Sequence, residues 1–246
     1  MSEETKTEVT EAAEASEGKT KKKFINENTL EILVAIFLGI TALLTAWATW
    51  IGSLHGGNQA TNYTTSNNLA SEGNAEYVAG IQQYFSDLLA WNTMMEYYFE
   101  EDIYTSEGNQ AAVDTIEAKL DNYIQQNGSQ ILYAAVNEMT AQGLTSPFDV
   151  EGVTESYFEK ANELLAESQA LLEQGKEDNA NGDAYNLVNV IYSVVLFMLG
   201  IIGIFRRIPN RAIVLLIAII ALVGATIYMC TIPLPTGFDL MSYFNG

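Results

Sequence analysis

The sequence predicts an all-α membrane protein with three transmembrane helices. The first two extend into an antiparallel helical arm outside the cytoplasm, and the arm ends in a small helical tip. Apolar runs occupy residues 29–54, 185–205 and 212–232, and about 20 such residues cross the hydrocarbon layer as a helix. Between the first two runs, apolar and aromatic residues recur at alternating steps of four and three, which is typical of packed helices. Basic clusters border the spans on one side only.

The N-terminal stretch, residues 1–28, is rich in Glu, Lys, Thr, Ala and Ser and has no apolar period, which predicts a disordered tail. Basic residues beside a span stay in the cytoplasm, so two basic clusters determine the predicted topology. They comprise Lys21, Lys22, Lys23, Arg206, Arg207 and Arg211. The tail and the turn 206–211 are therefore predicted to be cytoplasmic, and residues 55–184 and 233–246 to be extracytoplasmic. The predicted location of the protein is the plasma membrane.

The first span carries a weakly polar stripe, because Thr41, Thr45 and Thr49 recur every four residues. Small and weakly polar stripes let helices approach closely in lipid. The helical pattern continues beyond the span as a predicted seam, and Gly56 and Gly57 mark a point where the helix can bend. The seam consists of Tyr63, Asn67, Ala70, Asn74, Tyr77, Ile81, Tyr84, Leu88, Trp91, Met95 and Tyr98.

The predicted tip consists of short helices with recognisable caps. Ser106 is the predicted N-cap of a helix over 109–126, and Ser129 of the helix that follows. Gly143 is expected to end that second helix.

A second arm helix is predicted to begin near Val153 and to run into the second span. Residues 60–90 are therefore expected to face 150–180 in antiparallel order. Because the polar Asn67 and Asn74 occupy seam positions near the membrane end, this lower part of the arm is predicted to be looser than the upper part.

Two groups of side chains are candidate functional surfaces. Asn186, Asn189 and Ser193 share one face of the second span, and polar groups in lipid need partners. They are expected either to bond across helices, with the threonine stripe as one partner, or to line a wet cavity or oligomeric pore. The arm carries a surplus of aromatic residues that predicts a further interface. This second group consists of Tyr77, Tyr84, Trp91, Tyr97, Tyr98 and Phe99.

The charge of the chain excludes several function classes. The net charge is -20, and 22 of the 31 acidic residues lie between His55 and Asp183 against three lysines. Such a surface repels nucleic acid. One His and one Cys, Cys230, cannot form a His/Cys zinc cluster within one chain. The segment 177–183 begins like a calcium loop but lacks the closing Glu, so a helix break or cap is expected there.

No catalytic pattern is present in the sequence. Phosphate-binding, dinucleotide-binding and nucleophile-elbow motifs are absent, and His55 is interpreted as an interfacial anchor. No enzymatic activity and no cofactor are predicted.

Several fragments resemble a bacterial family of small membrane proteins with no assigned function. The fragments are Trp47 to Trp50 with the following segment 56–63, the dipeptide Pro147-Phe148, and 180–185 leading into 196–201. The resemblance implies three spans with an extramembrane helical domain, and it implies no activity.

The sequence thus favours a non-enzymatic integral membrane protein that presents an acidic, aromatic-rich helical arm. The expected partners are the lipid bilayer and either further copies of the chain or another membrane or envelope protein, and not nucleic acid. The alternative is an oligomeric cation channel or transport component, in which the acidic arm gathers cations.

Overall fold

A computed structural model describes residues 26–205 and 207–243 of the chain. Nearly all of the predicted tail, with Lys21, Lys22 and Lys23, and also Arg206 therefore lie outside the described residues. All regular structure in the described ranges is helical, which confirms the all-α prediction. The elements are α2 (Glu27–Ser106), α3 (Gln110–Asn127), α4 (Gln130–Gln142), η1 (Pro147–Asp149), α5 (Val153–Ser156), α6 (Glu159–Ile201), η2 (Ile202–Ile204), α7 (Ile208–Thr231) and η3 (Leu240–Tyr243).

Within the described residues, three helices are long and apolar enough to cross a membrane. They are α2, α6 together with η2, and α7. Each contains a stretch of at least 18 residues with high mean hydropathy and few charges. This confirms the three apolar helices, while the side of the membrane on which each segment lies stays a prediction.

The chain divides into two compact units. One comprises Met1–Ser53 and Asn181–Leu234, and we call it the apolar unit. The other comprises Leu54–Ala180 and Pro235–Gly246, and we call it the polar unit. Helices α2 and α6 contribute residues to both, and α2 continues through Gly56 and Gly57 without a break.

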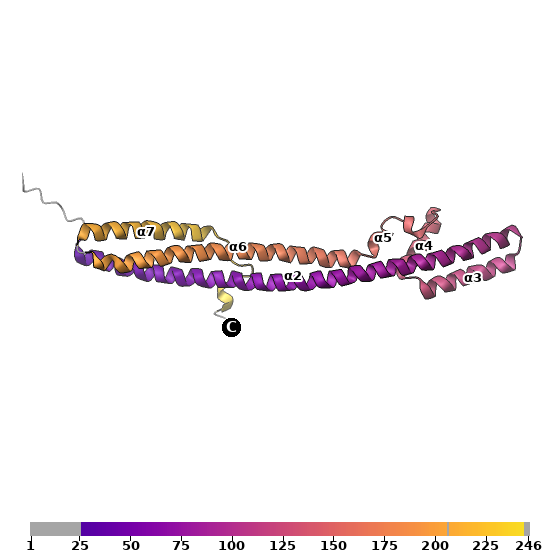
Figure 1. The fold of residues 1–246 in the computed structure, drawn as a ribbon, viewed down its shortest axis with the longest axis horizontal. Coiled ribbons are helices and arrows are strands. Elements are labelled where there is room, and N and C mark those ends of the chain that lie inside the picture. The colour runs from indigo at the N-terminus through magenta and orange to yellow at the C-terminus, as the bar shows by residue number, and fades with distance from the viewer. Residues whose placement is uncertain (1–25, 206, 244–246) are drawn as a thin grey trace, which may run out of the picture. The chain divides into compact units, whose positions relative to one another are not determined.

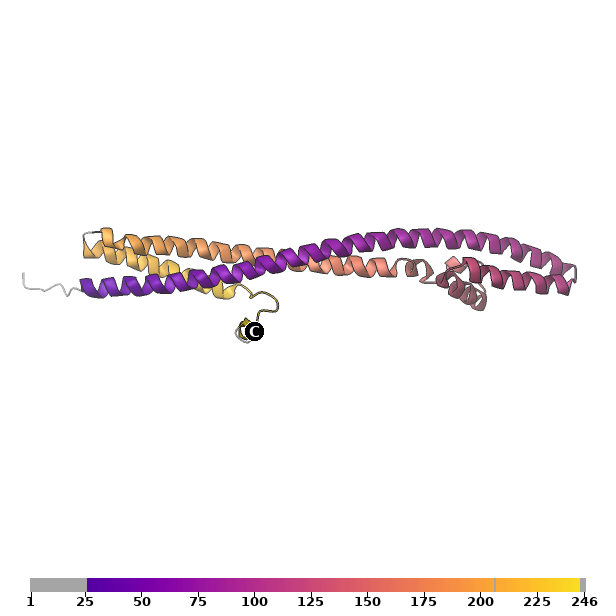
Figure 2. The same ribbon diagram turned by 90° about the horizontal axis from the view of Figure 1, so that it is seen from below.

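The core of the apolar unit follows a seven-residue pattern on both α6 and α7, which lie side by side (Figures 1 and 2). The buried positions alternate at steps of three and four, as in helices that pack knobs into holes. They are Tyr185, Val188, Tyr192, Val195 and Leu199 on α6, and Leu215, Ala218, Leu222, Ala225 and Met229 on α7. The Tyr192 hydroxyl lies 3.0 Å from Oγ1 of Thr226 and joins the two helices.

In the polar unit, α2 and α6 pack in antiparallel order. Ser66 Oγ donates to the Ser168 carbonyl at 2.8 Å, and Ser168 Oγ donates to the Ser66 carbonyl at 2.8 Å. Further along, the Tyr77 ring packs on Phe158 at 4.9 Å between centroids. Residues 60–80 thus face 157–175, as the sequence predicts.

The deepest positions of this pair are small. Ser66, Gly73 and Gly80 are buried at a seven-residue spacing on α2. A Cβ added at Gly80 would lie 2.3 Å from the Tyr157 carbonyl oxygen, so only glycine permits this approach. The predicted seam is therefore displaced by about one residue, since Asn67 and Asn74 are exposed.

The tip packs α3 and α4 around the end of α2, and Figure 1 shows α3 running back beside it. The tip core includes Trp91 and Met94 of α2 with Ile116 and Leu132. Ser129 caps α4 by accepting from the Leu132 amide at 3.1 Å, and Gly143 ends α4 with φ +68°, as predicted.

One predicted cap in the tip is wrong. Ser106 is the last residue of α2, and its hydroxyl donates to the Ile103 carbonyl of the same helix. Asn109 caps α3 instead, because its side chain accepts from the Ala112 amide.

Candidate functional site

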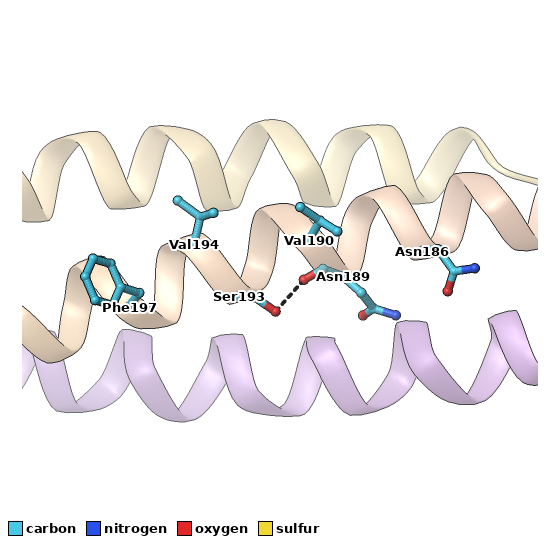
Figure 3. Close-up of a pocket in the computed structure, with 6 residues that line it drawn as sticks. All are labelled: Asn186, Asn189, Val190, Ser193, Val194 and Phe197. Carbon is cyan, nitrogen blue, oxygen red and sulfur yellow. Dashed lines mark hydrogen bonds between the residues drawn. The ribbon is translucent and has the colours of Figure 1, made fainter.

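A shallow groove runs along one face of α6 in the apolar unit (Figure 3). Its volume is about 570 Å³. Six side chains line it: Asn186, Asn189, Val190, Ser193, Val194 and Phe197. Figure 3 shows Val190 and Val194 on the side of α6 nearer to α7, and the polar residues on the side nearer to α2. The three predicted polar residues therefore do share one face.

The polar groups of this groove lack partners on other helices. Ser193 Oγ donates to the Asn189 carbonyl one turn earlier, at 2.8 Å. Asn189 Oδ1 is buried and has no hydrogen-bond partner, and it is the one such side-chain atom in the part of the chain that the structure describes. The Asn186 and Ser193 side chains are exposed. We call Asn186, Asn189 and Ser193 the amide face.

The threonine stripe of α2 does not complete this face. Thr41, Thr45 and Thr49 each donate to the carbonyl four residues earlier in their own helix, at 2.7, 2.7 and 2.8 Å. Hydroxyls on a helix commonly satisfy themselves in this way. In the described ranges, no hydrogen bond joins the stripe to the amide face, so that expectation was wrong.

The predicted aromatic surface is largely used inside the polar unit. Trp91 is buried, and its ring lies 5.8 Å from that of Tyr98. Tyr97 packs on Tyr123 of α3 at 5.9 Å. The tip helices thus cover some of the aromatic side chains that a single facing helix would leave exposed.

Tyr84 and Phe99 differ in their surroundings. Tyr84 contacts the rings of both Phe148 and Tyr157. Phe99 remains 62% exposed, and it belongs to an open surface together with residues that sequence reasoning did not single out.

Those residues form an exposed apolar stripe on α2. Five large side chains, each 52–68% exposed, contribute to it: Val78, Phe85, Leu89, Phe99 and Ile103. They lie beside the predicted seam and recur at steps of seven, four, ten and four residues, which keeps them on one side of the helix. A search for a second seam on the same helix would have found them.

A buried carboxylate, Asp87, connects three segments of the polar unit. Its side chain is fully buried. It accepts from the backbone amide of Ser129 at 2.9 Å, from the Ser129 hydroxyl, from the Tyr157 hydroxyl at 2.7 Å and from Gln83 at 3.1 Å. Burial, followed by the hydrogen bond to Asp87, raises the pKa of Tyr157 far above its usual value. Tyr157 therefore remains a donor, and Asp87 holds α2, the start of α4 and the α5–α6 connection together.

His55 is buried rather than placed as an interfacial anchor, which corrects the sequence interpretation. It is 1% exposed, and its Nδ1 lies 2.8 Å from Oδ1 of Asp178. Asn62 donates to the other oxygen of Asp178 at 3.3 Å. The calcium-like segment 177–183 is continuous helix within α6 rather than a break or cap.

Of the predicted topology determinants, only Arg207 and Arg211 are described. Arg207 is exposed at the start of α7. Arg211 lies 3.0 Å from Glu27 and donates to the Ile202 carbonyl at 3.3 Å. Arg211 thus secures the α6–α7 turn inside the apolar unit.

The described residues contain no group of three or more His, Cys, Asp or Glu side chains arranged to hold a metal ion. Comparison with known proteins finds no matching family model, no similar curated protein and no similar solved structure. The resemblance to a bacterial membrane-protein family therefore stays a prediction.

Proposed function

We propose that this chain is a non-enzymatic, multi-pass membrane protein that self-associates within the bilayer and presents its polar unit outside the cytoplasm for binding other proteins. The observation that carries the proposal is the amide face of α6, where the buried Oδ1 of Asn189 has no partner. The three long apolar helices support the membrane setting.

Exposure of the amide face to lipid is unfavourable in free energy. Hydrocarbon offers no donor or acceptor, and an unpaired amide there costs several kcal/mol by transfer data, on the order of 2–7. Interhelical bonds of Asn and Ser recover part of this, at about 0.6–2 kcal/mol each. A surface that is exposed in one copy therefore gains free energy when it is covered.

A second copy of the chain is the partner that fits this face. An Asn side chain carries two donors and an acceptor, so Asn189 of one copy complements Asn189 of another once rotation of the amide brings the buried Oδ1 to the surface of the groove. A two-fold axis passing near Asn189 brings Asn186 and Ser193 into the same contact, since such interfaces are self-complementary. The apolar Val190, Val194 and Phe197 add packing around the amides.

Mass measurement of the full chain in lipid nanodiscs tests this proposal. We expect the wild type to be a dimer or higher oligomer, and Asn189→Leu to shift it toward monomer by about tenfold in the association constant. The matched control is Thr49→Val, which removes an exposed polar group of the apolar unit whose hydroxyl bonds to its own helix. A monomeric wild type, or an unchanged Asn189→Leu, would contradict the proposal.

The alternative function is a cation-conducting oligomer, in which the amide face lines the pore. Three of the six groove residues are apolar, which favours packing over a wet channel. Bilayer currents from purified protein that disappear in Asn189→Leu would support the channel instead.

A further inference from the structure

The exposed stripe of α2 has the spacing of a helix-binding seam. Val78, Phe85 and Phe99 lie at multiples of seven residues, and Leu89 and Ile103 lie four residues after two of them. This repeat of 3.5 residues keeps the stripe on one side of the helix. From Val78 to Ile103 it extends about 38 Å at 1.5 Å per residue. An isolated exposed Leu needs no explanation, but five large exposed side chains on one side of a helix do.

The chain's own helices leave this seam open. Buried side chains on α2, such as Trp91 and Met94, pack into the tip core on another side of the helix. Beside the seam, a groove of about 390 Å³ opens between α2 and α3, lined among others by Leu89, Glu96 and Tyr123. Such a groove can accept a side chain from a helix lying along the seam.

The negative charge around the seam favours a basic partner. Helix α2 contains no Lys or Arg. Glu96 occupies a seam position, and Glu100 lies about one turn further along the helix. Between His55 and Ala180, the polar unit carries 21 acidic residues against three lysines. Lys160, one of these three, is engaged with Glu76. Two copies placed seam to seam would bring carboxylates against carboxylates, which opposes association.

We propose that the stripe Val78–Phe85–Leu89–Phe99–Ile103 binds an amphipathic α-helix with basic flanks from a protein other than this chain. The partner's apolar residues pack between Phe85, Leu89 and Phe99, and its Lys or Arg side chains lie against Glu96 and Glu100. Asn92, a polar residue in the middle of the seam, fixes the register, as single polar seam residues do in coiled coils. The inference depends on the proposed protein-binding role of the polar unit and is independent of self-association through α6.

The test uses the full chain in phosphatidylcholine nanodiscs and a designed helical peptide with Leu in a heptad seam and Lys at the flanking positions. We expect saturable binding, weakened at least tenfold by Phe85→Ser with Leu89→Ser. The matched control is Tyr133→Ser on α4, which removes an aromatic residue that is 47% exposed and lies outside the stripe. A peptide with Glu in place of Lys should bind at least tenfold more weakly, and the affinity for the Lys peptide should fall with salt.

Each other outcome overturns the proposal. Equal binding by the double serine variant would place the site elsewhere, and equal binding of the Glu peptide would refute the charge argument. Capture of the Lys peptide by empty nanodiscs to the same extent would make the bilayer its receptor. Disulfide cross-links between copies carrying Phe85→Cys would make the stripe a contact between copies. Asn189→Leu, which separates copies, should bind the Lys peptide unchanged, so the proposed self-association and this inference can fail independently.

Discussion

The two units differ in how several of their polar side chains are paired. In the polar unit, buried polar groups pair across helices, as in His55 with Asp178, Ser66 with Ser168 and Asp87 with Ser129. In the apolar unit, Thr41 and Ser193 bond to their own helix. Cross-helix hydrogen bonds fix the register of α2 against α6 in the polar unit, and we propose that the amide face of the apolar unit pairs with another molecule.

The largest expected effect comes from breaking the polar unit at Asp87. Asp87→Ala leaves the buried hydroxyl of Tyr157 and the amide of Ser129 without their acceptor. We therefore expect the free energy of unfolding to fall by about 3 kcal/mol or more. Hydrogen exchange should rise first in α4. The control, Asp114→Ala, removes an exposed carboxylate bonded only within α3 and should change little. Equal exchange in both variants would show that Asp87 does not connect the segments.

The close approach of α2 and α6 is tested by one substitution at two sites. Gly80→Ala places a methyl against the Tyr157 carbonyl, and overpacking of this kind costs about 1–3 kcal/mol. Gly57→Ala meets nothing within 4 Å and should stabilise the helix by about 0.5–1 kcal/mol. Thermal unfolding in detergent should therefore shift in opposite directions. Shifts in the same direction would refute the tight packing at Gly80.

A double-mutant cycle compares the cross-helix bonds of the polar unit with the self-bonded hydroxyls of the apolar unit. His55→Ala and Asp178→Ala should be coupled by about 1–2 kcal/mol, because removal of either leaves the other buried without this partner. Thr45→Val, which removes a hydroxyl bonded to its own helix, should change stability by less than about 0.5 kcal/mol. Additive effects at His55 and Asp178 would show that their contact does not stabilise the polar unit.

The smallest expected effect concerns charge at the tip. Burial, then repulsion from Glu117 and Asp102, raises the pKa of Glu101. A raised pKa in the folded state means that the ionised carboxyl opposes folding above that pKa, and protonation relieves this as the pH falls. Glu101→Gln should therefore stabilise the tip by a few tenths of a kcal/mol at pH 7, and the gain should shrink toward pH 5. A gain that is constant with pH would exclude this cause.

Much of the fold follows from the sequence, because hydropathy and helix caps are local properties. The three apolar runs, the antiparallel order of 60–80 against 157–175, and the caps at Ser129 and Gly143 were all predictable. The phase of the seam was not. A search for large apolar residues passes over Ser66, Gly73 and Gly80, which are buried because their small size lets two helices approach.

Sites that depend on several segments were less accessible to sequence reasoning. The contacts of Asp87 require α2, α4 and Tyr157 to come together, and no local sequence pattern predicts this. His55 was misplaced for the same reason, since its partner Asp178 is 123 residues away. The amide face was recognisable because Asn186, Asn189 and Ser193 follow the period of a single helix.

A cysteine scan along α6 in native membranes tests self-association through the amide face most directly. In a Cys230→Ser background, single cysteines at 186–197 would be oxidised and the chains separated by size. Our account predicts disulfide-linked dimers that peak at Asn186, Asn189 and Ser193 and are weakest at the buried Val188, Tyr192 and Val195. Uniformly absent cross-links, or maxima at these three buried positions, would contradict it.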